Sequence, residues 1–273
     1  PEIPLIAGGP HPTFVPDSVN TLDVNAIVVG EGDLAFPEIL RRISNEQNLD
    51  NIDNVALKGR TFSLGSLIED LDSLPDIERD FVYNHYARLL GNFKLKSFFT
   101  SRGCPFRCTY CFNHAYNKLY LGKGKMRRKR SVDRVISEIL EVKRKYPIGY
   151  IRFSDDVFVL QADDWLDEFR IKFKKQVGLP FYCLVSASTI TDDMVKSLKE
   201  AGCRSACMSI ESGIEHIRKN VLKRFMSDEK IIKAFDLFNK HGINLYTNSM
   251  IGIPGTTIED EFKTLDFAIR CRA

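Results

Sequence analysis

The stretch that decides the fold is Ser101-Arg102-Gly103-Cys104-Pro105-Phe106-Arg107-Cys108-Thr109-Tyr110-Cys111-Phe112-Asn113, with three cysteines within eight residues. It directly follows residues 97–100, which we predict to be a strand. Thiolates are soft ligands that select iron–sulfur clusters, zinc or copper. Spacings of three and two residues let one short loop reach three corners of a cubane cluster. The fourth iron then has no local protein ligand, as a substrate-binding cluster requires.

From residue 96 onward the sequence alternates between predicted strands and helices. The strands are expected at 97–100, 150–153, 181–185, 205–210 and 244–251. One helix has apolar residues at helical spacing from Val132 to Leu140, and a second begins after Thr191 and ends at Gly202. Five such units predict a complete or partial (β/α) barrel, and the cysteine loop then lies at the strand ends where barrel active sites form.

Two further helices complete these units. One is expected from Ser227 to Gly242, and the last follows Thr257. We expect the last helix to bury a set of four apolar side chains. This set is Ile258, Phe262, Leu265 and Ile269.

The first 48 residues have a different pattern. Short apolar runs at 3–7 and 26–29 end in glycine-rich turns, and residues 34–43 form an amphipathic helix. Strand–loop–helix units in succession imply a parallel sheet. Two strands cannot form a stable doubly wound domain, so we expect the first half of this domain to lie outside the chain. The predicted fold is therefore α/β, a partial TIM-like barrel preceded by the C-terminal part of a Rossmann-like domain.

Composition excludes some classes of function. The 273 residues carry a net charge of +3, and no apolar run approaches the roughly 20 residues that span a bilayer. The basic run at 123–130 has no interleaved aromatic residues, so we interpret it as a solvated loop and expect no nucleic-acid partner. Seven cysteines in a long chain indicate a metal site in the cytoplasm rather than a disulfide framework. We interpret the four outside the loop as buried small hydrophobes: Cys183, Cys203, Cys207 and Cys271.

Zinc is the alternative metal. His114 follows Cys111 by three residues, so Cys104, Cys108, Cys111 and His114 form a possible Cys3His set in a non-enzymatic binding module. The barrel context argues against it, because small zinc modules usually replace a core.

Cys104-x3-Cys108-x2-Cys111, with Tyr110 before the last cysteine, resembles the signature of the radical S-adenosylmethionine (SAM) superfamily. The resemblance covers residues 96–273, which we expect to be a core incomplete at its C-terminal end. It implies that the three cysteines hold a [4Fe–4S] cluster whose open iron binds SAM. An electron from a donor such as flavodoxin or ferredoxin then cleaves SAM to a 5′-deoxyadenosyl radical. The protein positions the cofactors and excludes solvent.

The resemblance also implies contacts to SAM at later strand ends. Glu211 is expected to accept the ribose hydroxyls, and Arg224 to meet the SAM carboxylate. The remaining expected SAM residues are Tyr110, Ser154, Asp155, Asp156, Asn248, Gly252, Pro254 and Gly255. One position departs from the pattern, because Ser186 stands where many relatives carry arginine.

The front of the chain resembles a cobalamin-binding domain fused ahead of a radical SAM core. Residues 1–48 would be its C-terminal portion and residues 49–95 a connector. Its glycines would make room for the cobalamin nucleotide tail, and the residues concerned are Gly8, Gly9, Gly30, Glu31 and Gly32. His11 does not match the cobalamin-ligand motif, which would lie upstream. We therefore expect cobalamin in the full-length parent.

The predicted reaction is cobalamin-dependent methyl transfer, or a related radical reaction, on an unknown small molecule or peptide. Methylthio-transfer to tRNA or protein is a second possibility. Such enzymes need a second cluster from an N-terminal cysteine set, and no cysteine precedes Cys104 in this chain.

Overall fold

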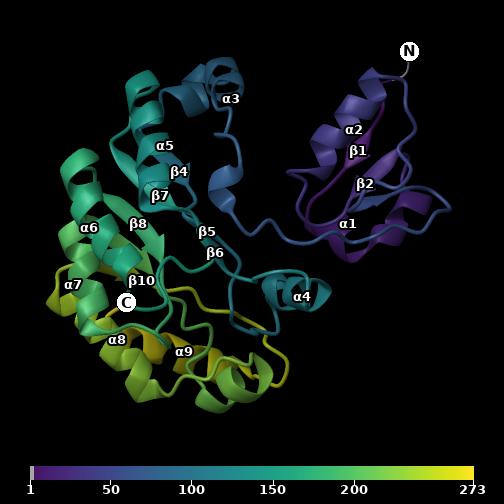
Figure 1. Cartoon of the computed structure of the whole chain (residues 1–273). Coiled ribbons are helices and arrows are strands. Elements are labelled where there is room, and N and C mark those ends of the chain that lie inside the picture. The colour runs from purple at the N-terminus through teal and green to yellow at the C-terminus, as the bar shows by residue number, and fades with distance from the viewer. Residues whose placement is uncertain (1–2) are drawn as a thin grey trace. The chain divides into compact units, whose positions relative to one another are not determined.

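The computed structural model describes residues 3–273, and its chain forms two units (Figure 1). The first unit comprises residues 1–69 and 111–126, and the second comprises 70–110 and 127–273. The stretch 49–95, expected to be a connector, is thus divided between the two units. The segment 111–126, expected within the barrel, belongs to the first unit.

The first unit contains the expected parallel strands. β1 (Ile6–Ala7) pairs in parallel with β2 (Ala26–Val28), and β3 (Val55–Ala56) pairs antiparallel with β2. β3 lies in the stretch 49–95 that was expected to be a connector. The predicted amphipathic helix is α2 (Ala35–Ser44), whose Ile39 packs into a core with Ala26 and Val28. The other helices of this unit are α1 (Pro10–Phe14), η1 (Pro16–Asn20) and α4 (Phe112–Leu119).

The second unit is built on a parallel sheet of five strands, which confirms the predicted partial barrel. Their order across the sheet is β10-β9-β8-β7-β4. Their bounds are β4 (Leu95–Phe98), β7 (Tyr150–Phe153), β8 (Phe181–Leu184), β9 (Cys203–Cys207) and β10 (Asn244–Tyr246). A short antiparallel pair, β5 (Ser101–Arg102) and β6 (Arg128–Lys129), extends from the end of β4.

Five longer helices alternate with the strands, and a side chain caps the first turn of each of these five. Ser131, Asp163, Thr191, Ser227 and Thr257 each accept a hydrogen bond from a backbone N–H in the first turn. The helices are α5 (Val132–Lys145), α6 (Asp164–Gln176), α7 (Asp192–Ala201), α8 (Asp228–Lys240) and α9 (Ile258–Arg270). Shorter helices are η2 (Leu71–Ser73), α3 (Asp80–His85), η3 (Ala87–Gly91) and η4 (Ile217–Val221). The sequence analysis named no helix at α6.

Phenylalanine rings fill the space between the sheet and α6. Phe153 and Phe181 come from strands, Phe169 and Phe173 from α6, and Phe158 from the loop between. Neighbouring ring centroids lie 4.8 to 6.0 Å apart. Burying such rings contributes most of the favourable free energy of a core, so this face of the sheet is a rigid base for the strand ends.

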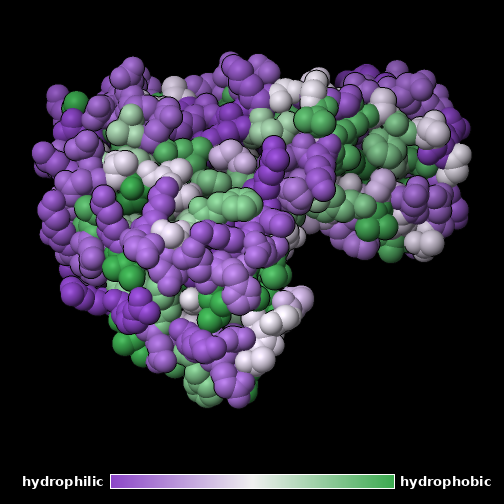
Figure 2. All heavy atoms as spheres, turned by 90° about the horizontal axis from the view of Figure 1, so that it is seen from below, coloured by the Kyte–Doolittle hydropathy of each residue, from purple (hydrophilic) through white to green (hydrophobic). Residues whose placement is uncertain are grey.

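The prediction for α9 was wrong. Its four apolar residues, Ile258, Phe262, Leu265 and Ile269, are 56 to 64 % exposed. The opposite face of α9 is buried instead, because Thr264 accepts a hydrogen bond from the Gly213 N–H and Phe267 packs into the core. Exposed apolar side chains occur elsewhere too, and Figure 2 shows hydrophobic residues between hydrophilic ones on the surface seen from below. Among residues 3–273, the helices are too short or too polar to cross a bilayer.

Candidate functional site

The expected SAM residues of the second unit follow its strands at their carboxyl ends. Ser154 and Asp156 come after β7, Glu211 after β9, and Asn248 and Gly252 after β10. In a parallel sheet these ends share one edge, where ligands of open α/β sheets bind. The cysteine loop begins at the same edge, because it follows β4 and β5.

Tyr110, Glu211 and Arg224 form one hydrogen-bonded cluster. The Tyr110 hydroxyl donates to Glu211 Oε1 over 3.0 Å and accepts from Arg224 Nη1 over 2.9 Å. Arg224 and Glu211 are also an ion pair at 3.7 Å, with both side chains largely buried. Burial raises the pKa of Tyr110, and the nearby Glu211 adds to this, so the phenol stays protonated. Three residues predicted separately are therefore in contact.

The cysteine loop is anchored to the segment after η4. Thr109 donates its backbone N–H to the Leu222 carbonyl over 3.2 Å and its hydroxyl to the Val221 carbonyl over 2.8 Å. Together with Tyr110, this fixes the loop's far end beside Glu211 and Arg224. Thr109 carries no sequence signal of this role, because its partners lie more than 100 residues away.

Glu211 and Asn248 are held together through the backbone. The Glu211 N–H donates to the Asn248 carbonyl over 3.0 Å, and Met250 N–H donates to the Glu211 carbonyl over 2.8 Å. Glu211 has φ of 67°, in the left-handed region that non-glycine residues rarely occupy. Such conformations cluster at functional sites, where the surrounding structure imposes them.

Asp155, one of the expected SAM residues, is buried against the start of the cysteine loop. Only 1 % of its surface is exposed, and its carboxylate accepts hydrogen bonds from the Thr100 backbone N–H, the Thr100 hydroxyl and the Ser101 hydroxyl. Burial raises the pKa of Asp155, while these donors oppose the shift. The carboxylate thus contacts the start of the cysteine loop. Its neighbours differ, since Asp156 is exposed and Ser154 partly exposed.

The expected adenine-binding segment forms an exposed turn after β10. Gly252 and Gly255 have φ of 74° and 87°, which a side chain would strain. The Gly252 N–H donates to Glu261 at the start of α9 over 3.1 Å, which ties the turn to that helix. Pro254 is exposed between them.

The basic run was predicted to be solvated, and for its second half this was wrong. Arg127 donates to the carbonyls of Val157 and Phe158 over 2.8 and 3.2 Å, and Arg128 is 4 % exposed. Lys129 lies over the Trp165 ring, and Arg130 pairs with buried Glu138. These cations therefore stabilise the fold. Burial lowers the pKa of Arg127, and the negative charges of Asp155 and Cys104 oppose this shift.

The three loop cysteines differ from the other four. Cys104, Cys108 and Cys111 are partly exposed, and the remaining four are buried, as expected of small hydrophobes. All seven lie in the described part of the chain, and none is in a disulfide. Within residues 3–273 no three His, Cys, Asp or Glu side chains are already gathered as a metal site. Cluster ligation and zinc binding with His114 both stay predictions.

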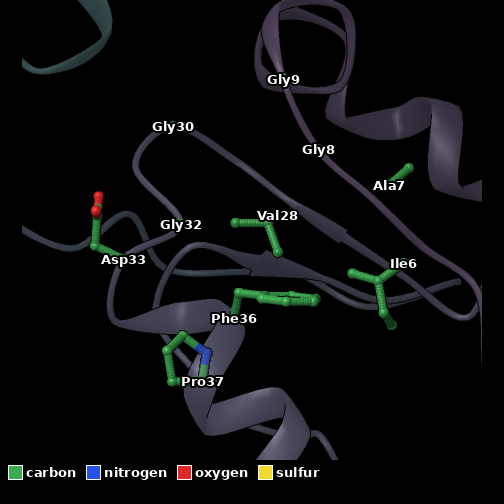
Figure 3. Close-up of a pocket in the computed structure, with 10 residues that line it drawn as sticks. All are labelled: Ile6, Ala7, Gly8, Gly9, Val28, Gly30, Gly32, Asp33, Phe36 and Pro37. Carbon is green, nitrogen blue, oxygen red and sulfur yellow. The ribbon is translucent and has the colours of Figure 1, made fainter. Parts of the chain in front are cut away.

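The first unit contains a pocket of about 540 Å³ at the carboxyl ends of β1 and β2. Four of the expected residues line it: Gly8, Gly9, Gly30 and Gly32. Figure 3 shows the side chains of Val28 and Phe36 lying between the glycine-containing loops and α2. Glu31 is not among the lining residues. The pocket is open and partly apolar, and the backbone of the glycine-containing loops forms part of its wall.

A family model and several known proteins match this chain. The family model described as "Radical SAM superfamily" matches residues 98–268. An uncharacterised methyltransferase of Pyrococcus horikoshii is 31 % identical over 97 % of this chain. The cytidylyl-2-hydroxyethylphosphonate methyltransferase of Streptomyces wedmorensis is 22 % identical over 98 %. The chain spans 57 % of the length of each of these relatives.

Solved structures share the fold. The radical SAM methyltransferase TsrM of Kitasatospora setae, solved with cobalamin and a [4Fe–4S] cluster, superposes with a TM-score of 0.76 at 18 % identity. The match covers 99 % of this chain and 53 % of TsrM. The cobalamin-dependent radical enzyme OxsB, solved with aqua-cobalamin and SAM, gives 0.75 at 19 % identity, covering 96 % of this chain and 38 % of OxsB.

Proposed function

This chain belongs to the radical SAM superfamily, and from that premise we propose that it is the catalytic core of an enzyme that cleaves SAM reductively at a [4Fe–4S] cluster. The observation that carries the proposal is the cluster of Tyr110, Glu211 and Arg224 at the carboxyl edge of the sheet. Through Tyr110 this cluster joins the cysteine loop to Glu211 and Arg224, two of the residues that are expected to bind SAM.

Cys104, Cys108 and Cys111 would hold the iron–sulfur cluster. Their donor set fits it, because all three are partly exposed thiols outside any disulfide, on a loop attached at both ends. When bound, the cluster supplies the electron that cleaves SAM. The chain's own contribution is to fix the loop and to shield the site from water.

Glu211 and Arg224 suit the two ends of SAM. A carboxylate accepts two ribose hydroxyls, and a guanidinium binds a carboxylate in a bidentate manner. Their ion pair at 3.7 Å partly offsets both charges before a ligand arrives. Tyr110 holds each in position through its hydroxyl, and its pKa, raised by burial, keeps the proton needed for the bond to Glu211.

Anaerobic reconstitution tests this function. We expect a brown protein with about four irons and four sulfides per chain, which forms 5′-deoxyadenosine with dithionite and SAM. The His114→Ala variant should behave in the same way, because His114 has no role in the cluster. A colourless protein that binds one zinc, and loses it in His114→Ala, would contradict the proposal and support the binding-module alternative.

We further propose that the reaction of the whole protein is a cobalamin-dependent methyl transfer. The two relatives described above are methyltransferases by name, which favours this reaction over methylthio-transfer. The pocket lined by Gly8, Gly9, Gly30 and Gly32 would accept the nucleotide tail of cobalamin. When bound, cobalamin would carry the methyl group, and this chain's residues would hold its tail through the shape of the pocket and contacts with its lining.

A leucine at Gly8 should block that pocket. A Cβ at Gly8 would meet Val28 at 3.9 Å, an ordinary contact, so a longer side chain can enter the pocket without backbone strain. In the protein that carries this chain, we expect hydroxocobalamin affinity, followed by absorbance, to fall about tenfold or more. The exposed substitution Lys58→Leu serves as the control and should leave affinity unchanged. Unaltered binding in Gly8→Leu would place cobalamin elsewhere.

A further inference from the structure

The sheet of the second unit has one face that its helices do not cover. Side chains alternate along strands, so Ile151 and Phe153 of β7 point into the helix-side core and Arg152 points to the opposite face. The register pairs Arg152 with Tyr182 on β8. Arg152 is exposed, although β7 has a neighbouring strand on each side.

Arg152 lies beside an aromatic ring of the neighbouring strand. Its guanidinium carbon lies 5.8 Å from the centroid of the Tyr182 ring. Within residues 3–273 no carboxylate forms an ion pair with it, whereas Arg79, Arg130 and Arg218 each pair with an acidic side chain. A strand holds this positive charge in a defined place, next to an aromatic ring.

Arg152 is the first of a row of three side chains. Two tyrosines continue this row toward the residues that are expected to bind SAM. The rings of Tyr182 and Tyr246 stack with centroids 5.6 Å apart and planes 9° from parallel. Tyr182 is buried, with 7 % of its surface exposed, and Tyr246 is 47 % exposed, so Tyr246 presents the accessible ring of the pair. Cys207, which lies opposite Tyr246 in the strand register, accepts a hydrogen bond from the Asn248 amide over 3.6 Å. The row therefore ends at an expected SAM contact.

We propose that Arg152, Tyr182 and Tyr246 form the substrate subsite, and that the substrate carries an anionic group beside a planar unsaturated ring. Arg152 would bind the anion, a carboxylate or a phosphate-type group, through paired N–H donors. Tyr246 would contact the ring. This inference rests on the proposed function, since it takes the reacting carbon to lie beside the SAM site.

A matched pair of probes tests the charge requirement. Indole-3-acetate and indole-3-acetamide share one flat ring and differ in charge, so their affinities at millimolar concentration can be compared by calorimetry. We expect the acetate to bind about tenfold more tightly than the amide, because one charge-assisted hydrogen-bonded pair contributes about this much to the affinity. Arg152→Gln should abolish this preference. Tyr246→Ala should weaken both probes by a similar factor.

Arg204→Gln is the control, because Arg204 is likewise an exposed arginine on a strand of this sheet. It should keep the preference for the acetate. Equal binding of both probes, binding of neither, or a preference that survives in Arg152→Gln would overturn the inference. The titrations need no cluster and no SAM cleavage. A protein that forms no 5′-deoxyadenosine but keeps the preference for the acetate would therefore contradict the proposed function alone. A protein that forms 5′-deoxyadenosine but shows no such preference would contradict this subsite alone.

Discussion

Replacing Cys108 with alanine is expected to abolish cluster binding. A three-cysteine site that loses one thiolate keeps only two protein ligands, too few to hold a cubane cluster with one open iron. Reconstituted iron should fall from about four per chain to below about one, and 5′-deoxyadenosine formation by more than about 100-fold. Iron and sulfide analysis and the visible spectrum measure the first effect, and chromatography of the product measures the second.

Cys271→Ala provides the matched control. Cys271 is buried at the end of α9 and is outside the loop, so its removal deletes a thiol of the same type without touching the site. It should retain a full cluster. If Cys108→Ala kept four irons, the cluster would lie elsewhere and the role given to this loop would be wrong.

Asp155→Ala is expected to have the second largest effect. The change removes the acceptor of three donors on Thr100 and Ser101 and leaves them buried. Buried donors without partners cost about 1–3 kcal/mol each, so the free energy of unfolding should fall by at least about 3 kcal/mol. The loop that starts at these residues should also lose its position, and cluster content should drop several-fold. Thermal unfolding and iron analysis measure the two effects.

Two variants separate anchoring from ligand contact. Asp155→Asn keeps one oxygen that can accept these hydrogen bonds, so it should retain most of the stability and most of the iron. The adjacent Asp156→Ala changes an exposed side chain and should leave stability unchanged within about 0.5 kcal/mol. If Asp155→Asn instead kept full iron content and lost SAM binding, Asp155 would be a SAM contact as the sequence suggested.

The sequence by itself determined the family and the architecture of the second unit. The spacing of Cys104, Cys108 and Cys111 is local information, which the chain carries whatever its tertiary packing. Strand and helix periodicity is local as well, so the five parallel strands were predictable, with their ends shifted by a few residues. Caps such as Ser131 and Thr191 are local for the same reason.

Only the tertiary structure decided what each polar side chain contacts. The sequence could place Asp155 and Asp156 at one strand end, but their different roles depend on Thr100, some 55 residues away. The basic run looked solvated because the partners of Arg127, the carbonyls of Val157 and Phe158, follow it by 30 and 31 residues, and periodicity cannot reveal such contacts.

The apolar pattern of α9 correctly predicted a helix, but it did not predict which face of that helix is buried. Periodicity locates apolar residues on one side, but burial depends on which neighbours are present, and here Gly213 and the core take the opposite side. Long-range hydrogen bonds and packing determine these outcomes. For that reason the cysteine motif was readable from the sequence, whereas the Tyr110, Glu211 and Arg224 contacts were not.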